Sequence, residues 1–126
     1  FFLHEVDVDQ INENSKTLCW HHVVPEMNHN ELVGWTGGDQ RFAPIFFNTG
    51  DLHPRNYRRF EISQNAVEKK CGKVLLVSAK GDSFIERSVY LINIVDWASY
   101  YLCEMNGADI IDIEIIDYLK GELAKF

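Results

Sequence analysis

Short, continuously apolar runs alternate along the chain with longer segments in which apolar residues recur with a helical period. The short runs are rich in β-branched and aromatic residues and are bounded by turn-forming residues, as is typical of buried strands. The longer segments have the spacing of helices that bury one face. The predicted strands are residues 17–24, 43–48 and 73–79, and the predicted helices are residues 4–15, 28–35, 54–70, 84–106 and 112–125.

Residues that favour helix ends support these boundaries. Asn28 is followed three residues later by Glu31, a spacing that resembles a capping box and predicts the start of the second helix. Pro54 suits the first turn of the third helix. Gly72 and Gly107 suit the positions just after the third and fourth helices. We therefore expect these helices to begin and end close to these residues.

Strands that alternate with helices indicate the fold class. Because each predicted strand is apolar along its whole length, the pattern predicts an α/β domain whose parallel sheet is flanked by helices on both faces. Three strands are few for such a sheet. We therefore expect neighbouring strands to come either from residues upstream of Phe1 or from a partner chain.

The predicted helix 84–106 is apolar nearly all round, since only three polar residues interrupt residues 89–102. Such a helix is buried, either in a core or at a subunit interface. Arg87 and Asp96 lie within it and its apolar run is short, which argues against a membrane span. Because one small sheet cannot cover so much apolar surface, we expect the chain to form a homodimer.

Length and composition narrow the class of protein. The 126 residues, 46% of them hydrophobic, suffice for one domain with one core and exclude a disordered chain. A net charge of -7 argues against nucleic-acid binding, but it does not exclude an anionic substrate, which is recognised by local charges. Three cysteines without paired spacing indicate reduced thiols and a cytoplasmic protein. The chain begins at Phe1 without Met or a signal peptide, so we expect a piece of a longer chain.

Two polar clusters flank the predicted strand 17–24 and hold the candidate catalytic residues. Glu13 lies in residues 10–16 and His29 in residues 25–35. Ligands of α/β proteins bind at sheet edges, and we expect both clusters to lie there. A partly desolvated Glu13 could shuttle a proton, and a neutral imidazole at His29 could donate or accept one. From residue types alone, a solvated glutamate and a surface or capping histidine are the more frequent cases.

Other kinds of site have weaker support in the sequence. Residues 19–29 contain cysteine, histidine and glutamate, but their spacing matches no known metal site. Residues 78–83 follow a strand and precede a helix, yet they lack the glycine spacing of a nucleotide-binding loop. The basic residues within 54–73 are most simply one solvated helix face. We therefore expect no metal site.

Four motifs point to one family. They are Gln-Ile-Asn-Glu-Asn-Ser-Lys at residues 10–16, Pro-Glu-Met-Asn-His-Asn-Glu-Leu-Val-Gly-Trp at 25–35, Ser-Tyr-Tyr-Leu at 99–102 and Ile-Asp-Tyr-Leu-Lys at 116–120. Over residues 5–123 the chain resembles the C-terminal half of the bifunctional phosphoglucose/phosphomannose isomerases, members of the sugar-isomerase (SIS) domain superfamily. It departs from them at residues 107–113, where the family often has a proline-containing turn.

The resemblance implies roles for three residues. Glu13 corresponds to the base that moves a proton between carbons 1 and 2 of the sugar through a cis-enediol. His29 corresponds to the residue that assists ring opening and that is contributed across the dimer interface. Lys120 corresponds to a residue near the ring oxygen or the phosphate. Glucose 6-phosphate or mannose 6-phosphate would then interconvert with fructose 6-phosphate, without a metal ion or redox cofactor.

The resemblance also implies that part of the enzyme lies elsewhere. Family members are much longer, and their phosphate-binding Ser/Thr loop belongs to an N-terminal SIS domain. We therefore expect a three-layer SIS-like C-terminal domain that carries catalytic side chains but is inactive alone. The alternative is a non-catalytic SIS-type module that binds a sugar phosphate or mediates dimerisation. Glu13 and His29 favour the enzyme, since a sensor needs no proton shuttle.

Overall fold

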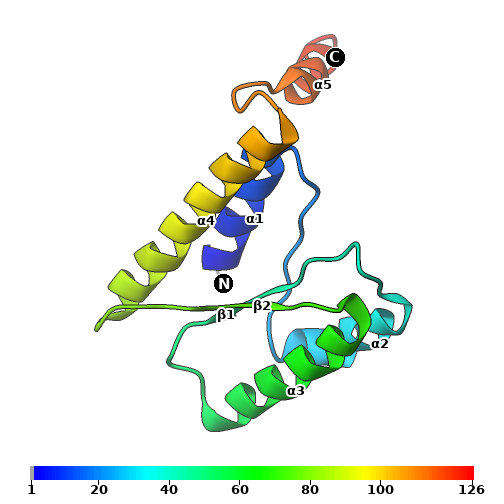
Figure 1. The fold of residues 1–126 in the computed structure, drawn as a ribbon. Coiled ribbons are helices and arrows are strands. Elements are labelled where there is room, and N and C mark those ends of the chain that lie inside the picture. The colour runs from blue at the N-terminus through cyan, green and yellow to red at the C-terminus, as the bar shows by residue number, and fades with distance from the viewer. Residues whose placement is uncertain (1) are drawn as a thin grey trace.

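The computed structural model describes residues 2–126, with side chains from Val8 onward, as an α/β fold around a parallel pair of strands (Figure 1). In chain order the elements are α1 Phe2–Ser15, η1 Glu26–His29, α2 Glu31–Gly34, η2 Trp35–Gly37, β1 Ile45–Asn48, α3 Pro54–Cys71, β2 Leu75–Ser78, α4 Phe84–Asn106 and α5 Glu114–Leu123, where η marks a 3-10 helix. β1 and β2 pair in parallel, with Ile45 opposite Leu75, and α3 provides the crossover that this pairing requires. The predicted α/β class is confirmed.

Helices lie on both sides of the two strands (Figure 1). α2 and α3 lie on one side, α1 and α4 lie on the other, and α5 follows beyond the end of α4. The main core forms between the sheet and α3, where Phe46 packs edge-on against Phe60 with ring centroids 5.2 Å apart. Val67 and Cys71 extend this core along α3. The sheet is therefore anchored chiefly to α3.

Local sequence signals set both ends of α3. His53 Nδ1 accepts a hydrogen bond from the Arg55 amide at 3.3 Å, and Pro54 occupies the first helical position. Gly72 follows the helix with a φ of 81°, a left-handed conformation that a residue without a side chain adopts at little cost. The predicted start and end of this helix are confirmed.

α1 and α4 pack against each other through small and polar residues and run in the same direction (Figure 1). Ser99 of α4 is fully buried, and its Oγ accepts a hydrogen bond from Asn14 Nδ2 at 2.9 Å. Near the C-terminal ends of the two helices, Asn106 Nδ2 donates to the Ser15 carbonyl oxygen at 3.0 Å. Small side chains at the contact allow the two helix backbones to approach closely, and the two side-chain bonds fix their register.

α4 buries a single stripe instead of its whole circumference. The buried residues recur every four positions and are Leu91, Val95, Ser99 and Cys103. On the other faces Trp97 is 55% exposed and Tyr101 is 59% exposed. Within the single chain α1 covers only one side of this helix, so the core does not bury it all round, and its burial at a subunit interface stays a prediction.

The predicted strand 17–24 is absent. Lys16 has a φ of 55°, which turns the chain out of α1, and residues 16–23 have no regular structure. Asn12 Oδ1 accepts from the Cys19 amide and Asn12 Nδ2 donates to the Cys19 carbonyl, both at 2.9 Å. A side chain thus satisfies backbone groups that a neighbouring strand would otherwise satisfy. Within residues 2–126 the sheet has two strands and not the three predicted.

The second predicted helix begins later than its capping signal indicated. Asn30 is the residue before α2, and its Oδ1 accepts from the Glu31 amide at 2.6 Å. Asn28 instead donates from Nδ2 to Ser63 Oγ of α3, also at 2.6 Å. The predicted capping box at Asn28 is therefore wrong, because its side chain connects η1 to α3.

Candidate functional site

Glu13 lies in the last turn of α1 with an exposed side chain, beside a cavity of about 330 Å³. Asp9 and Asn12 line the same cavity from α1, and Ile116 lines it from α5. Among the side chains described from Val8 onward, none forms a hydrogen bond or ion pair with the Glu13 carboxylate. The carboxylate is therefore available to a ligand.

The residues on either side of Glu13 are fixed by hydrogen bonds. Asn12 is bonded to the backbone of Cys19, as described above, and Asn14 is bonded to Ser99 of α4. The end of α1 is thereby held on two sides, while the Glu13 side chain is exposed. A fixed backbone with a free carboxylate suits a group that must transfer a proton between two neighbouring atoms.

α5, which carries Lys120, reaches the same cavity, although Lys120 is not among the residues that line it. Ile116 lines the cavity, and Lys120 lies one helical turn later on the same face of α5. Four residues of helix advance about 6 Å along its axis, which is within the reach of a lysine side chain. Lys120 is exposed. Glu13 and Lys120 therefore lie on elements that meet at one cavity.

His29 lies elsewhere in the fold. It is the exposed last residue of η1, which leads into α2. Figure 1 places α2 on the α3 side of the strands, whereas α1 lies on the other side. The expectation that the clusters around Glu13 and His29 share a sheet edge is wrong, because residues 17–24 form no strand. Within one chain the structure does not bring His29 to Glu13 and Lys120.

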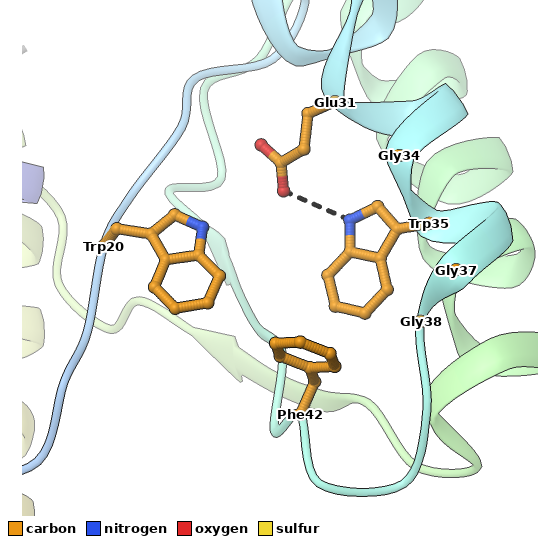
Figure 2. Close-up of a pocket in the computed structure, with 7 residues that line it drawn as sticks. All are labelled: Trp20, Glu31, Gly34, Trp35, Gly37, Gly38 and Phe42. Atoms are coloured by element: carbon orange, nitrogen blue, oxygen red, sulfur yellow. Dashed lines mark hydrogen bonds between the residues drawn. The ribbon is translucent and has the colours of Figure 1, made fainter.

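A second cavity, of about 190 Å³, was not predicted. It is lined by Trp20, Glu31, Gly34, Trp35, Gly37, Gly38 and Phe42. Figure 2 shows the three aromatic rings around an open space, with the Glu31 carboxylate beside them. The sequence contains one signal for it, the spacing of four residues between Glu31 and Trp35. Trp20 and Phe42 lie outside helices and strands, so no periodicity brings them together.

Two carboxyl groups outside both cavities have shifted pKa values. Hydrogen bonds from the Ser83 amide and hydroxyl, with a further one from the Asp82 amide, lower the pKa of Glu86. Hydrogen bonds from the side chain and the amide of Arg41 lower the pKa of Asp39. Both groups are stabilised as carboxylates by local turns, so neither suits proton transfer near neutral pH.

The described residues form neither a metal-binding cluster nor a membrane-spanning helix. No three histidine, cysteine, aspartate or glutamate side chains in that part of the chain gather as a metal site. No helix there has the length and apolar character needed to cross a membrane. No disulfide joins Cys19, Cys71 and Cys103 in the described part of the chain.

The fold and the sequence together define the class. The parallel strand–helix–strand unit with helices on both sides is that of an α/β domain, and residues 8–123 match the family described as the bacterial phospho-glucose isomerase C-terminal SIS domain. Because this match spans most of the chain, the chain belongs to that family. The resemblance seen in the sequence motifs is confirmed.

Three similar proteins share the name bifunctional phosphoglucose/phosphomannose isomerase. The bifunctional phosphoglucose/phosphomannose isomerase of Aquifex aeolicus is 34% identical over 119 residues, which are 92% of this chain and 37% of that protein. The isomerase of the same name from Thermoplasma volcanium is 31% identical over 118 residues, covering 91% of this chain and 37% of that protein. The isomerase of the same name from Caldicellulosiruptor bescii is 31% identical over 119 residues, which are 92% of this chain and 35% of that protein. The chain thus spans little more than a third of these relatives.

Proposed function

We propose that this domain supplies proton-transfer residues to an isomerase that interconverts glucose 6-phosphate or mannose 6-phosphate with fructose 6-phosphate. The family and the names of the relatives support these substrates. The observation that carries the proposal is the unpaired Glu13 carboxylate, held at the fixed end of α1 beside a cavity that α5 also lines. We expect the enzyme to be cytoplasmic, in keeping with cysteines that no disulfide joins.

Glu13 acts as the base in this proposal. It removes the proton from carbon 2 of the open-chain aldose phosphate and returns it to carbon 1. Between the two steps the substrate is a cis-enediol, and a hydroxyl proton moves from oxygen 2 to oxygen 1. The carboxylate ends as it began and no electrons leave the substrate, so the reaction is redox-neutral.

His29 and Lys120 complete the proposed site. A neutral imidazole at His29 takes up and returns the proton that opens the sugar ring. We assign it to the Glu13 site of a second copy, because the exposed His29 precedes α2, which lies on the other side of the strands from α1. Lys120 places a positive charge near the ring oxygen or the phosphate, where negative charge resides. A homodimer would thus hold two shared sites.

The chain by itself is expected to be inactive. It spans 37% of the Aquifex aeolicus isomerase, and the resemblance implies that the phosphate-binding loop belongs to an N-terminal SIS domain. The second candidate function is a non-catalytic module for dimerisation or sugar-phosphate binding. The exposed aromatic residues of α4, which suit an interface, favour it as the role of the isolated chain.

A chimera tests the proposal directly. Residues 8–123 replace the corresponding C-terminal segment of the Aquifex aeolicus isomerase, and fructose 6-phosphate conversion is followed by a coupled assay. The chimera is expected to convert fructose 6-phosphate. In the chimera, Glu13→Gln is expected to reduce kcat by about a thousandfold or more with little change in KM, because the base is lost. The isolated chain is expected to show no turnover.

The matched control is Glu104→Gln, which removes an exposed carboxylate from α4 outside both cavities. It should leave kcat unchanged. Unaltered turnover in Glu13→Gln would remove Glu13 from the role of base. Robust turnover by the isolated chain would refute the expectation that its activity depends on further residues. A chimera that folds and binds fructose 6-phosphate but is inactive would favour the non-catalytic module.

A further inference from the structure

The residue that directly follows α1 has an unusual backbone conformation. Among residues 2–126, Lys16 is the one non-glycine residue with a positive φ, of 55°. The residues that directly follow α3 and α4 are Gly72 and Gly107, with φ values of 81° and 63°. Glycine adopts this left-handed conformation readily, whereas a residue with a Cβ atom does so at an energetic cost. The end of α1 thus carries a side chain where the ends of α3 and α4 carry none.

The Lys16 side chain turns back onto the last turn of α1. Its Nζ donates a hydrogen bond to the Glu13 carbonyl oxygen at 2.7 Å. This oxygen is one of the last carbonyl groups of the helix, which have no donor within it. A lysine after a helix can supply the donor, and a glycine cannot. The bond restrains the backbone of the residue that carries the proposed base.

The same ammonium group reaches the loop that precedes α5. Lys16 Nζ donates to the Ile110 carbonyl oxygen at 3.5 Å, a long bond whose donor carries a full positive charge. Ile110 belongs to residues 107–113, which connect α4 to α5. One side chain therefore bridges two segments that lie 94 residues apart in the sequence.

α5 depends on its loop for its position. None of its residues is buried, and Ile115 on it is 85% exposed. A helix that buries little apolar surface gains little packing energy, so the loop that carries it determines where it lies. Ile116 of α5 nevertheless lines the cavity together with Glu13 of α1. The bridge through Lys16 therefore connects the two elements that form this cavity.

We infer that Lys16 is a positioning residue of the Glu13 site. Its ammonium group holds the last turn of α1 against the loop that positions α5, and so fixes the proposed base relative to the other wall of the cavity. Lys16 does not line the cavity, so it acts through Glu13 and not on the substrate. The effect on turnover rests on the proposed function, whereas the bridge itself can be measured without it.

Hydrogen–deuterium exchange of the chain, read by mass spectrometry, measures the bridge in the absence of substrate. The variant is Lys16→Gly, which removes the ammonium group and suits a φ of 55°. α1 keeps its hydrogen bonds to Ser99 and Asn106 of α4, so the variant is expected to fold and its midpoint in urea is expected not to fall. Residues 107–119 should exchange about three- to tenfold faster than in the parent chain, and α3 should exchange as before.

Two further variants separate the bridge from a general effect of substitution. Lys16→Arg keeps a positive charge and N–H donors, and should exchange within about twofold of the parent chain. Lys73→Gly makes the same lysine-to-glycine change at an exposed position shortly after α3, outside both cavities. It should leave the exchange of residues 107–119 unchanged.

Turnover is measured in the chimera described above. Lys16→Gly should lower kcat about tenfold or more, because a small displacement of the base slows proton transfer. KM for fructose 6-phosphate should change less than about threefold, because Lys16 lies outside the cavity. Lys16→Arg should keep kcat within about threefold of the parent chimera, and Lys73→Gly should leave it unchanged.

The outcomes distinguish this inference from the proposed function. Full turnover by Glu13→Gln would refute the proposed base and with it the effect of Lys16 on catalysis, while exchange would still decide the bridge. An inactive Glu13→Gln beside an unaffected Lys16→Gly would overturn the positioning role alone. Unchanged exchange of residues 107–119 in Lys16→Gly would overturn the bridge, as would equal losses in Lys16→Arg. A midpoint in urea that falls in parallel with kcat would make Lys16 a merely structural residue and overturn the inference.

Discussion

Two residues, Ser83 and Glu86, determine how α4 begins. Ser83 Oγ accepts from the Glu86 amide at 3.2 Å, and the Glu86 carboxylate accepts from the Ser83 amide at 2.7 Å. This reciprocal pair is a capping box, which satisfies amides that the first turn leaves without a helical partner. The negative charge also lies at the helix N-terminus, where it is favoured. Residues 78–83 were predicted to connect a strand to a helix, but this capping box was not predicted.

Removing this cap should destabilise the chain in a pH-dependent way. Ser83→Ala is expected to lower the free energy of unfolding by about 1 kcal/mol at pH 7. Since the folded-state pKa of Glu86 is lowered, its carboxylate contributes stability above the ordinary glutamate pKa and loses it as pH falls through the lowered value. The difference in stability between the parent chain and Glu86→Gln should therefore shrink from pH 7 to pH 3.

Urea denaturation followed by circular dichroism at several pH values measures both effects. Glu104→Gln, at the far end of the same helix, provides the control and should show no such narrowing. A stability difference for Glu86→Gln that stays constant or grows toward pH 3 would contradict the role of its carboxylate.

At the scale of elements, the contact between α1 and α4 depends on small side chains. Ser15 and Ser99 are both fully buried. Ser99→Leu should push the two helices apart and lower the free energy of unfolding by about 1–3 kcal/mol, because a packed contact does not accommodate the extra volume. Ser99→Ala loses the hydrogen bond from Asn14 and the one that Ser99 Oγ donates to the Asp96 carbonyl oxygen, and should cost about 1 kcal/mol.

Thermal denaturation of the two variants distinguishes the effect of the larger side chain on stability from the effect of the lost hydrogen bonds. An equal loss in Ser99→Leu and Ser99→Ala would mean that the hydrogen bond, not the packing, holds α1 against α4. In the chimera, Ser99→Leu should also lower isomerase activity, because it displaces the end of α1 that carries Glu13.

Most elements could be predicted because their limits are encoded locally. Pro54 and Gly72 mark α3, and the apolar runs at 43–48 and 73–79 contain β1 and β2. Residues 17–24 have the composition of a strand but no pairing partner, because strand formation depends on a neighbour that composition does not specify. Likewise, Asn28 and Asn30 are both suitable caps, and only the contact of Asn28 with Ser63 decides between them.

At the scale of the whole molecule, α4 presents an exposed apolar surface that a second copy would cover. Trp97 and Tyr101 stack with centroids 5.9 Å apart, and both are more than half exposed. Exposed aromatic clusters of this kind mark interaction surfaces. We expect the chain to sediment as a dimer, and Tyr101→Glu to shift it to the monomer by placing a charge in the interface.

Analytical ultracentrifugation across a range of concentrations gives the mass of the species. Ile62→Glu introduces the same charge at an exposed apolar position of α3 and should leave the dimer intact if α4 forms the interface. A monomer at all concentrations would refute the predicted dimer, and with it the assignment of His29 to the site of a second copy.

The candidate site could be predicted only in part. The sequence motifs singled out Glu13, His29 and Lys120, but not which of them lie together, because that depends on how α1 and α5 meet. The second cavity, lined by Trp20, Trp35 and Phe42, was not predicted for a similar reason. Two of its rings come from irregular segments, whose positions are set by tertiary contacts and not by a repeating pattern.

The common direction of α1 and α4 has an electrostatic consequence for the proposed substrate. Because the Asn106 side chain bonds to the Ser15 carbonyl, the C-terminal ends of both helices lie together. Each helix end carries about half a negative charge from its unpaired carbonyl groups, so the two fields add. This end of the molecule repels a phosphate dianion. We therefore expect a sugar phosphate to approach Glu13 with its uncharged carbons 1 and 2 foremost and its phosphate directed away from the paired helix ends.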